Sequence, residues 1–485
     1  MANKSLLIII FFFLGFSKNS FPQNPDRPNI LFVIGDDWSH GHAGVYGDPV
    51  VKTPNIDGIA KEGAVFLNAF CAAPSCSPSR ASVLTGRYPH ELEAGASLWG
   101  YLPKKYSNYS AILQQAGYHV GLTGKGWGPG NFEAGGYEHN PAGKTYKDFA
   151  TFLEARPEGQ PFSFWFGSQN PHRPYEPGSG LASGKDPGKV KVPGWLPDVS
   201  GVRHDILDYY HEVEQFDRQL GEILSILRES GEIENTLIII TGDNGMPFPR
   251  AKATLYDSGA KIPLIMSLKG KINPGTEVKE LVSLTDIAPT ILELTGQDIV
   301  KEMTGTTLWP LLIGEKVNNR KMVFIERERH ANVRKAELGY PARAIRTDEY
   351  LYIRNYEPDR WPAGDPEVYH SVGPYGDVDA SPTKEYILSN RTQATVAPFF
   401  SRAFAKRNAE ELYDLKADPD QLNNVVSDKK YLKILDELKK HLNDWQVRTG
   451  DPRVTSSHNV VFDQYLYFGP PVEGAPSNYK PELNK

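Results

Sequence analysis

The chain has 485 residues, of which 40% are hydrophobic and 23% charged; this is the composition of a globular protein and excludes a mainly disordered one. At about 150 residues per domain, the length predicts two or three domains with a substantial core. The formal net charge of -6 excludes a global positive field that would attract nucleic acid, so a polyanionic partner would have to be held by local basic clusters.

The N-terminus combines one lysine with an apolar run over residues 6–16, the arrangement of a secretory signal peptide. That run has about half of the roughly 20 residues that a membrane-spanning helix needs, and no second run of spanning length follows. We therefore predict a signal peptide over residues 1–22 and a secreted or periplasmic protein without a membrane span; a buried N-terminal strand is the alternative. Only Cys71 and Cys76 are present, so disulfides do not carry the fold, although a bridge between the two remains open.

Apolar runs alternate with amphipathic stretches through the first two thirds of the chain, a pattern typical of a mostly parallel sheet with helices on both faces. The runs expected to be central strands are residues 30–34, 162–167, 237–241 and 262–266. Apolar side chains recur at three- and four-residue steps over residues 204–230, which predicts one long helix ending at Gly231. We place this α/β domain at residues 23–320.

After about residue 320 the sequence becomes rich in aromatic and arginine residues, as in residues 350–354, and turns are frequent. This change predicts a smaller antiparallel subdomain over residues 321–485. Leucines and Trp445 form one helical stripe over residues 432–445, and the Gly-Asp-Pro sequence at residues 450–452 ends that helix. We expect this terminal helix to pack on the small sheet.

Two polar pairs follow two of the expected strands: Asp36 with Asp37, and Asp243 with Asn244. Open α/β sheets bind ligands at the carboxyl ends of their strands, so the two pairs should meet there. Carboxylates brought together without a cation would repel each other. Three carboxylates and an amide carbonyl are hard oxygen ligands that suit Ca²⁺ or Mg²⁺ rather than zinc. Taken alone, each pair could also be a helix cap or a plain turn.

Residues 76–87, Cys-Ser-Pro-Ser-Arg-Ala-Ser-Val-Leu-Thr-Gly-Arg, resemble the signature of the type I formylglycine-dependent sulfatases. In that family a formylglycine-generating or equivalent maturation enzyme oxidises the Cys to an aldehyde. One oxygen of the hydrated aldehyde attacks sulfur, and the other then expels sulfate. The resemblance implies that Cys76 becomes formylglycine (3-oxoalanine); an ordinary Ser or Cys would leave a sulfated enzyme with no internal way to release the product.

The same resemblance implies the alkaline-phosphatase-like sulfatase fold. In this fold class a large mixed, mostly parallel α/β sheet is flanked by helices, and a smaller C-terminal antiparallel subdomain carries the terminal helix. Residues 23–320 would then be the catalytic sulfatase domain.

Further roles follow from the resemblance. One Ca²⁺ per chain would be held by Asp36, Asp37, Asp243, Asn244 and the modified Cys76 side chain. Arg80 matches the residue that braces the nucleophile and the cation, and the sulfate-binding and leaving-group positions fall on Lys125, His172 and Lys252. Such donors stabilise the charge on sulfate, and one of them can protonate the departing atom. Trp127 departs from the family, which often has a His there, so either another His takes that role or the site works with one imidazole fewer.

Several stretches, among them residues 242–249 and 340–343, are most similar to the heparan N-sulfatase (sulfamidase) branch and indicate a polysaccharide substrate. The segment 326–346 is rich in cations that could hold an acidic sugar, because Arg binds sulfate and carboxylate through two parallel hydrogen bonds. We predict substrate contacts from Arg327, Arg329, His330 and Arg343. A salt-bridged face is the alternative.

We therefore predict a secreted or periplasmic sulfatase that hydrolyses sulfate groups from a sulfated polysaccharide or its oligosaccharides. An O-sulfate of an algal polymer such as ulvan and an N-sulfate of a heparan-type chain both remain open. The alternatives are a phosphonate or phosphate monoester hydrolase of the same superfamily and a non-catalytic protein that binds sulfated glycans.

Overall fold

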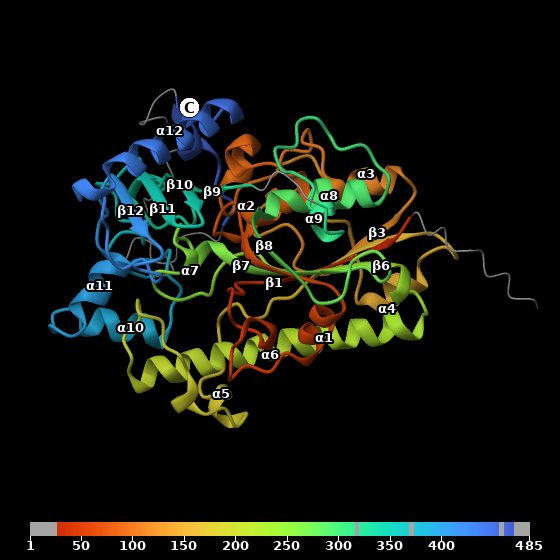
Figure 1. Cartoon of the computed structure of the whole chain (residues 1–485), viewed down its shortest axis with the longest axis horizontal. Helices are drawn as coiled ribbons and strands as arrows, with labels where there is room; N and C mark the ends of the chain where they lie inside the picture. The colour runs from red at the N-terminus through yellow and green to blue at the C-terminus, as the bar shows by residue number, and fades with distance from the viewer. Residues whose placement is uncertain (1–26, 316–319, 368–372, 455–459, 470–485) are drawn as a thin grey trace, which may run out of the picture.

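The computed structural model describes residues 27–315, 320–367, 373–454 and 460–469. The predicted signal peptide lies outside the described residues. Two separate β-sheets organise the described chain, one of eight strands and one of four (Figure 1).

The larger sheet has the strand order β4-β3-β5-β1-β6-β7-β2-β8. Its strands are β1 (Asn29–Gly35), β2 (Ala64–Phe70), β3 (His119–Gly124), β4 (Lys144–Thr145), β5 (Phe162–Gly167), β6 (Thr236–Gly242), β7 (Lys261–Ser267) and β8 (Thr276–Ser283). All neighbouring pairs are parallel except the two pairs made by β7, so the sheet is mixed and mostly parallel, as predicted. The four predicted central strands are confirmed as β1, β5, β6 and β7.

Helices cover both faces of this sheet (Figure 1). On one face lie α1 (Pro54–Glu62), α4 (Phe149–Glu154), α5 (Ser179–Ala182) and the long α6 (Ser200–Glu229); on the other lie α2 (Cys76–Thr85), α3 (Tyr109–Gln115), α8 (Ile287–Leu294) and α9 (Trp309–Leu312). The short α7 (Asp257–Ala260) leads into β7. The predicted long helix is α6; it begins earlier than expected, at Ser200, and its first turn adds the buried side chain of Val202.

The smaller sheet is antiparallel throughout, as predicted, in the order β12-β11-β10-β9. Its strands are β9 (Met322–Arg327), β10 (Ala342–Thr347), β11 (Tyr350–Asn355) and β12 (Glu410–Asp414), and α10 (Pro382–Ser389) and α11 (Ala397–Phe404) lie between the last two. The terminal helix α12 (Leu432–Thr449) packs on this sheet, where the Trp445 ring stacks on Phe324 at a centroid distance of 4.5 Å. Gly450 ends α12 in the left-handed conformation, with φ of 71°.

The short 3₁₀-helices are Gly44–Tyr46, Pro89–Ala96, Pro187–Lys189, Ile233–Asn235, Leu284–Asp286, Lys335–Glu337, Lys429–Tyr431, Pro452–Val454 and Val461–Gln464. The predicted boundary at residue 320 falls between β8 and β9. Apolar side chains of the two sheets share one core, in which Val323 and Ile325 of β9 pack in the same cluster as Leu281 and Val282 of β8. The small sheet is thereby fixed beside the loop that follows β6, where the Arg327 guanidinium donates a hydrogen bond to the Ala253 carbonyl oxygen.

Candidate active site

The register of the central strands brings the two polar pairs together. β1 and β6 run parallel with Gly35 opposite Gly242, so both strands end at the same level. Asp37 has a φ of 67°, a conformation that few residues other than glycine adopt, and its N–H donates to Asp243 Oδ1 at 2.9 Å. This turn and hydrogen bond hold the two strand ends against each other.

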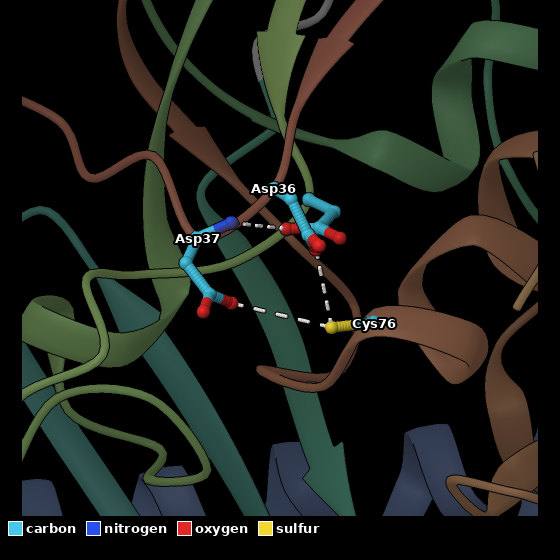
Figure 2. Close-up of side chains that lie close together, drawn as sticks. Asp36, Asp37 and Cys76 are labelled. Atoms are coloured by element: carbon cyan, nitrogen blue, oxygen red, sulfur yellow. Dashed lines mark hydrogen bonds between the residues drawn. The ribbon is translucent and has the colours of Figure 1, made fainter. Parts of the chain in front are cut away.

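Helix α2 presents Cys76 to the acidic pairs (Figure 2). Cys76 is the first residue of the helix, and its Sγ lies 3.4 Å from Asp36 Oδ1 and 4.0 Å from Asp37 Oδ1. Both cysteines are free, so the alternative of a bridge between Cys71 and Cys76 does not hold. The thiol stays within reach of the carboxylates.

Arg80 lies one turn further along α2, on the same helix face as Cys76. Its side chain is fully buried; Nε donates to Asp243 Oδ2 at 2.8 Å and Nη1 to the Lys125 carbonyl oxygen at 2.6 Å. This guanidinium therefore connects the helix that carries Cys76 with β6 and with the segment after β3.

Three more cationic or imidazole side chains surround the acidic cluster, at the positions that the sequence predicted. Lys125 Nζ donates to both carboxylate oxygens of Asp36, at 2.8 and 2.7 Å, and Lys252 Nζ donates to Asp37 Oδ2 at 2.8 Å. His172 Nε2 lies 3.7 Å from the same oxygen of Asp37, and its side chain is 34% exposed. His172 thus stands at the open side of the cluster, whereas Lys252, at 5%, is buried.

Burial and neighbouring charges shift the pKa values of the site groups in different directions. Burial raises the pKa of Asp37 to about 6, despite the opposing charges of Lys252 and His172. For Asp36, Lys125 and Arg80 together outweigh burial and hold the pKa well below its usual range. Burial and the neighbouring Asp36 raise the pKa of the Cys76 thiol well above its ordinary value. The unmodified Cys76 is therefore a thiol rather than a nucleophilic thiolate.

The donor set fits a hard divalent cation. One ligand atom from each of Asp36, Asp37, Cys76 and Asp243 lies within 4.8 Å of all the others. Asn244 Nδ2 donates to Asp37 Oδ1 and Asp243 Oδ1, whereas its own Oδ1 is buried without a hydrogen-bond partner. A half-turn of this amide would bring the unpartnered oxygen into the acidic cluster and complete an oxygen-rich shell.

The structure does not present Arg343 or Arg329 to a substrate. Arg343 is fully buried in the small subdomain, where Glu326, Glu328 and Asp451 bind its guanidinium. Arg329 is 1% exposed and donates to the carbonyl oxygen of Tyr465 at 2.7 Å. Buried acids bind Arg343, and backbone carbonyl oxygens accept hydrogen bonds from Arg329, so this part of the cation-rich segment lies inside the protein and is not an open patch.

The other two predicted substrate-binding residues lie closer to the site, but they too have partners in the protein. Arg327 pairs with Asp377, and His330 Nδ1 lies 2.8 Å from the hydroxyl oxygen of Ser75, the residue before Cys76. Burial lowers the pKa of His330 to about 3, so its imidazole is neutral. Trp127, at the position where the family often has a His, is buried in the core.

Asp379 is a site residue that the sequence did not predict. Its Oδ2 lies 3.3 Å from Lys252 Nζ, and its side chain is 30% exposed. The residue stands in a loop of the small subdomain without apolar periodicity or a recognisable motif, so only the folded chain shows that it reaches the site.

The mixed sheet, with carboxylates, cations and a cysteine gathered at the carboxyl ends of its strands, defines a hydrolase of the alkaline-phosphatase-like fold. The profile of the family described as Sulfatase matches residues 28–144 and 131–297, and the profile of N-sulphoglucosamine sulphohydrolase, C-terminal, matches residues 250–369. The chain belongs to the sulfatase family, and it is an enzyme of that family.

Characterised relatives cover most of the chain. It is 28% identical to human N-sulphoglucosamine sulphohydrolase over 495 residues, which covers 90% of this chain and 93% of the human protein. It is 26% identical to an ulvan-active sulfatase of Formosa agariphila over 483 residues, which covers 88% of this chain and 76% of that protein.

Solved structures share the fold. A protein solved in complex with its substrate D-glucosamine-2-N,6-O-disulfate superimposes with a TM-score of 0.65 at 21% identity, covering 89% of this chain and 99% of that one. The phosphonate monoester hydrolase of Agrobacterium radiobacter also gives a TM-score of 0.65, at 17% identity, covering 87% of this chain and 96% of that one. Among the described residues, none of the helices has the length and apolar character to span a membrane.

Proposed function

We propose that this sulfatase is secreted or periplasmic and removes sulfate from a sulfated polysaccharide or its oligosaccharides. In this proposal Cys76, converted to formylglycine by a maturation enzyme, is the nucleophile, and one Ca²⁺ is the cofactor. The observation that carries the proposal is the meeting of Cys76 with Asp36, Asp37 and Asp243 at one edge of the sheet, ringed by three residues that can contact sulfate.

Asp36, Asp37, Asp243 and the carbonyl oxygen of Asn244 would hold the cation. They are hard oxygen ligands from two strand ends, which favours Ca²⁺ over zinc. When bound, the cation polarises the sulfate group and favours the ionised nucleophile.

Lys125 and Lys252 would bind the sulfate oxygens. Both ammonium groups neutralise the carboxylates of Asp36 and Asp37. A cation held by these carboxylates would take over that neutralisation and leave N–H donors of both lysines for sulfate. Arg80 would keep α2 and β6 in place, since its guanidinium is fully buried between them.

His172 would protonate the departing atom. Its Nδ1 lies 2.5 Å from the carbonyl oxygen of Arg173, which can only accept a hydrogen bond, so Nδ1 carries the proton in the neutral ring. Nε2, which faces Asp37, then gains its proton in the imidazolium form and can give it to the leaving group.

A sulfated saccharide is the substrate class that the relatives support. The human relative is named for N-sulphoglucosamine and the bacterial relative for ulvan, so glucosamine N-sulfate, heparan-type oligosaccharides and ulvan oligosaccharides are the first substrates to test. Sugar units away from the scissile sulfate would supply binding energy that helps to position this sulfate for reaction.

The test measures free sulfate by ion chromatography after incubation with each oligosaccharide. The wild-type protein should release sulfate from at least one of them, and Cys76→Ala should not. Cys71→Ala is the matched control, because it removes the other buried thiol, outside the acidic cluster, and should retain activity. Faster turnover of aryl phosphate than of aryl sulfate, with no sulfate released from any saccharide, would contradict the proposal and favour a phosphoester or phosphonate hydrolase.

A further inference from the structure

Asp379 places an additional carboxylate at the cationic side of the site. Its Oδ2 lies 3.3 Å from Lys252 Nζ, which also donates to Asp37 Oδ2 at 2.8 Å. Lys252 therefore contacts both Asp37 of the acidic cluster and Asp379 of the small subdomain. The Asp379 Oδ2 atom is buried and makes no well-aligned hydrogen bond, while the side chain as a whole is 30% exposed.

The neighbouring acid Asp377 shows how a structural carboxylate in this loop is neutralised. Asp377 is 2% exposed, and one of its oxygens accepts hydrogen bonds from both Arg327 and Arg334. Asp379 has no such arginine pair hydrogen-bonded to it among the described residues. Lys252, His172 and His330 act on its charge most strongly, and Arg173 and Lys384 also interact with it electrostatically. Lys252 and His172 hold the pKa of Asp379 below the ordinary value against the effect of burial. Asp379 is thus an ionised carboxylate with unused hydrogen-bonding capacity.

A carboxylate beside a sulfate site repels the substrate unless the substrate brings a hydrogen-bond donor or a positive charge to it. The two kinds of sulfate differ in this respect. Hydrolysis of a sulfamate with one water gives an ammonium cation and sulfate, because the electron pair of the S–N bond stays on nitrogen, which then takes up protons. Hydrolysis of a sulfate ester gives a neutral alcohol, sulfate and a proton, and negative charge develops on the ester oxygen as the S–O bond breaks.

We propose that Asp379 is a specificity-determining residue that accepts a hydrogen bond from the nitrogen of a sulfamate leaving group, so that the site favours N-sulfate over O-sulfate. The inference rests on the proposed function. The sulfamate nitrogen carries an N–H before the bond breaks and a positive charge once hydrolysis is complete, so its interaction with Asp379 strengthens along the reaction. An ester oxygen offers no hydrogen in the substrate, and the same carboxylate opposes the charge that develops on it.

The first test compares glucosamine N-sulfate with glucosamine that carries only an O-sulfate, in wild type, Asp379→Asn and a control. The control is Asp359→Asn, which removes an exposed carboxylate from the small subdomain. Asn keeps an acceptor oxygen but not the negative charge that strengthens the hydrogen bond, so Asp379→Asn should lower kcat/KM for the N-sulfate by about 10-fold more than for the O-sulfate. Asp359→Asn should leave the ratio of the two values as in wild type. Equal losses on both sulfates in Asp379→Asn would overturn the assignment.

The second test needs no turnover. Isothermal titration calorimetry should show that wild-type protein binds glucosamine, as its ammonium form, more tightly than N-acetylglucosamine, and that Asp379→Asn loses this preference by about tenfold. A Ca²⁺-induced rise in Tm equal to that of wild type would show that the substitution leaves the metal cluster intact. An unchanged preference for glucosamine in Asp379→Asn would refute the role of this residue. If wild type hydrolyses sulfated saccharides but Asp379→Asn keeps the wild-type ratio, this inference alone fails; if wild type hydrolyses none of them, the proposed function fails and this inference fails with it.

Discussion

Replacing Arg343 by Met should destabilise the protein rather than remove a substrate contact. The Arg343 side chain is fully buried, with Nε 2.8 Å from Asp451 Oδ2 and 3.0 Å from Glu326 Oε2, and with Nη2 2.8 Å from Glu328 Oε1. The substitution would leave these carboxylates in the interior without their shared cation.

Breaking a buried ion pair by removing one partner costs about 3 to 5 kcal/mol. In the variant, Arg453 still pairs with Glu328, and His90 still contacts Glu326. Asp451 is therefore the carboxylate that loses most of its ion pairing, and the low end of that range applies, about 3 kcal/mol. With an unfolding entropy of about 2.1 cal/mol/K per residue, a chain of 485 residues loses about one degree of Tm per kcal/mol, which predicts a fall of about 3 °C.

Thermal unfolding monitored by circular dichroism measures this effect, with Arg354→Met as the control. Arg354 lies directly opposite Arg343 on the neighbouring strand, and its charged or polar neighbours are Tyr352, Tyr356 and the partly exposed Glu410 rather than buried acids. The control should lower Tm by less than about 1 °C, as expected for a partly exposed position.

The stability that the Arg343–Asp451 ion pair contributes depends on pH in a definite direction. Arg343 and His90 outweigh burial and hold the pKa of Asp451 below its unfolded value, so the stability that this pair contributes is present at neutral pH and is lost as the pH falls through the acid range. The Tm difference between wild type and Arg343→Met should therefore shrink on acidification. A variant with wild-type Tm and a selective loss of kcat/KM on the sulfated saccharide would refute the structural role and restore the substrate contact.

Three further results are expected. Removing Ca²⁺ with a chelator should lower Tm, and restoring it at 100 times its Kd should stabilise the protein by about 2.7 kcal/mol. Unchanged melting curves would contradict the proposal that the acidic cluster binds Ca²⁺. In initial-rate kinetics, His172→Ala should reduce kcat on a saccharide sulfate by about 10²- to 10⁴-fold. It should reduce kcat on an aryl sulfate much less, because a phenolate departs without a proton. Equal losses of kcat on both substrates would argue against an acid role for His172. Trp445→Ala should destabilise the chain by about 3 to 5 kcal/mol in urea unfolding, since its ring is 1% exposed and stacked on Phe324, and a change below 1 kcal/mol would contradict the packing of α12 on the small sheet.

The strands that the sequence predicted correctly are those whose burial on both faces leaves continuous apolar runs. β8 is different: its first half alternates between exposed and buried positions, and its pairing with β2 contains a register shift, so its pattern is not that of a central strand. The direction of β7, antiparallel to both neighbours, depends on the path of the connection and has no local signal.

The acidic pairs could be placed together because adjacent parallel strands end at one edge, and the motif around Cys76 added the nucleophile. The cation-rich segment was harder to interpret, since the sequence shows the arginines but not the acids that reach them. Asp377 and Asp451, which neutralise Arg327 and Arg343, come from loops far along the chain. For the same reason Asp379, which reaches Lys252 only in the folded protein, had no sequence signal.

The most direct test of the proposed mechanism is mass spectrometry of the peptide that contains Cys76, taken from enzyme with measured sulfatase activity. An aldehyde at position 76, confirmed by borohydride reduction, should be present in a fraction that rises in step with specific activity across preparations. A fully active enzyme whose peptide carries only an unmodified thiol would contradict the mechanism.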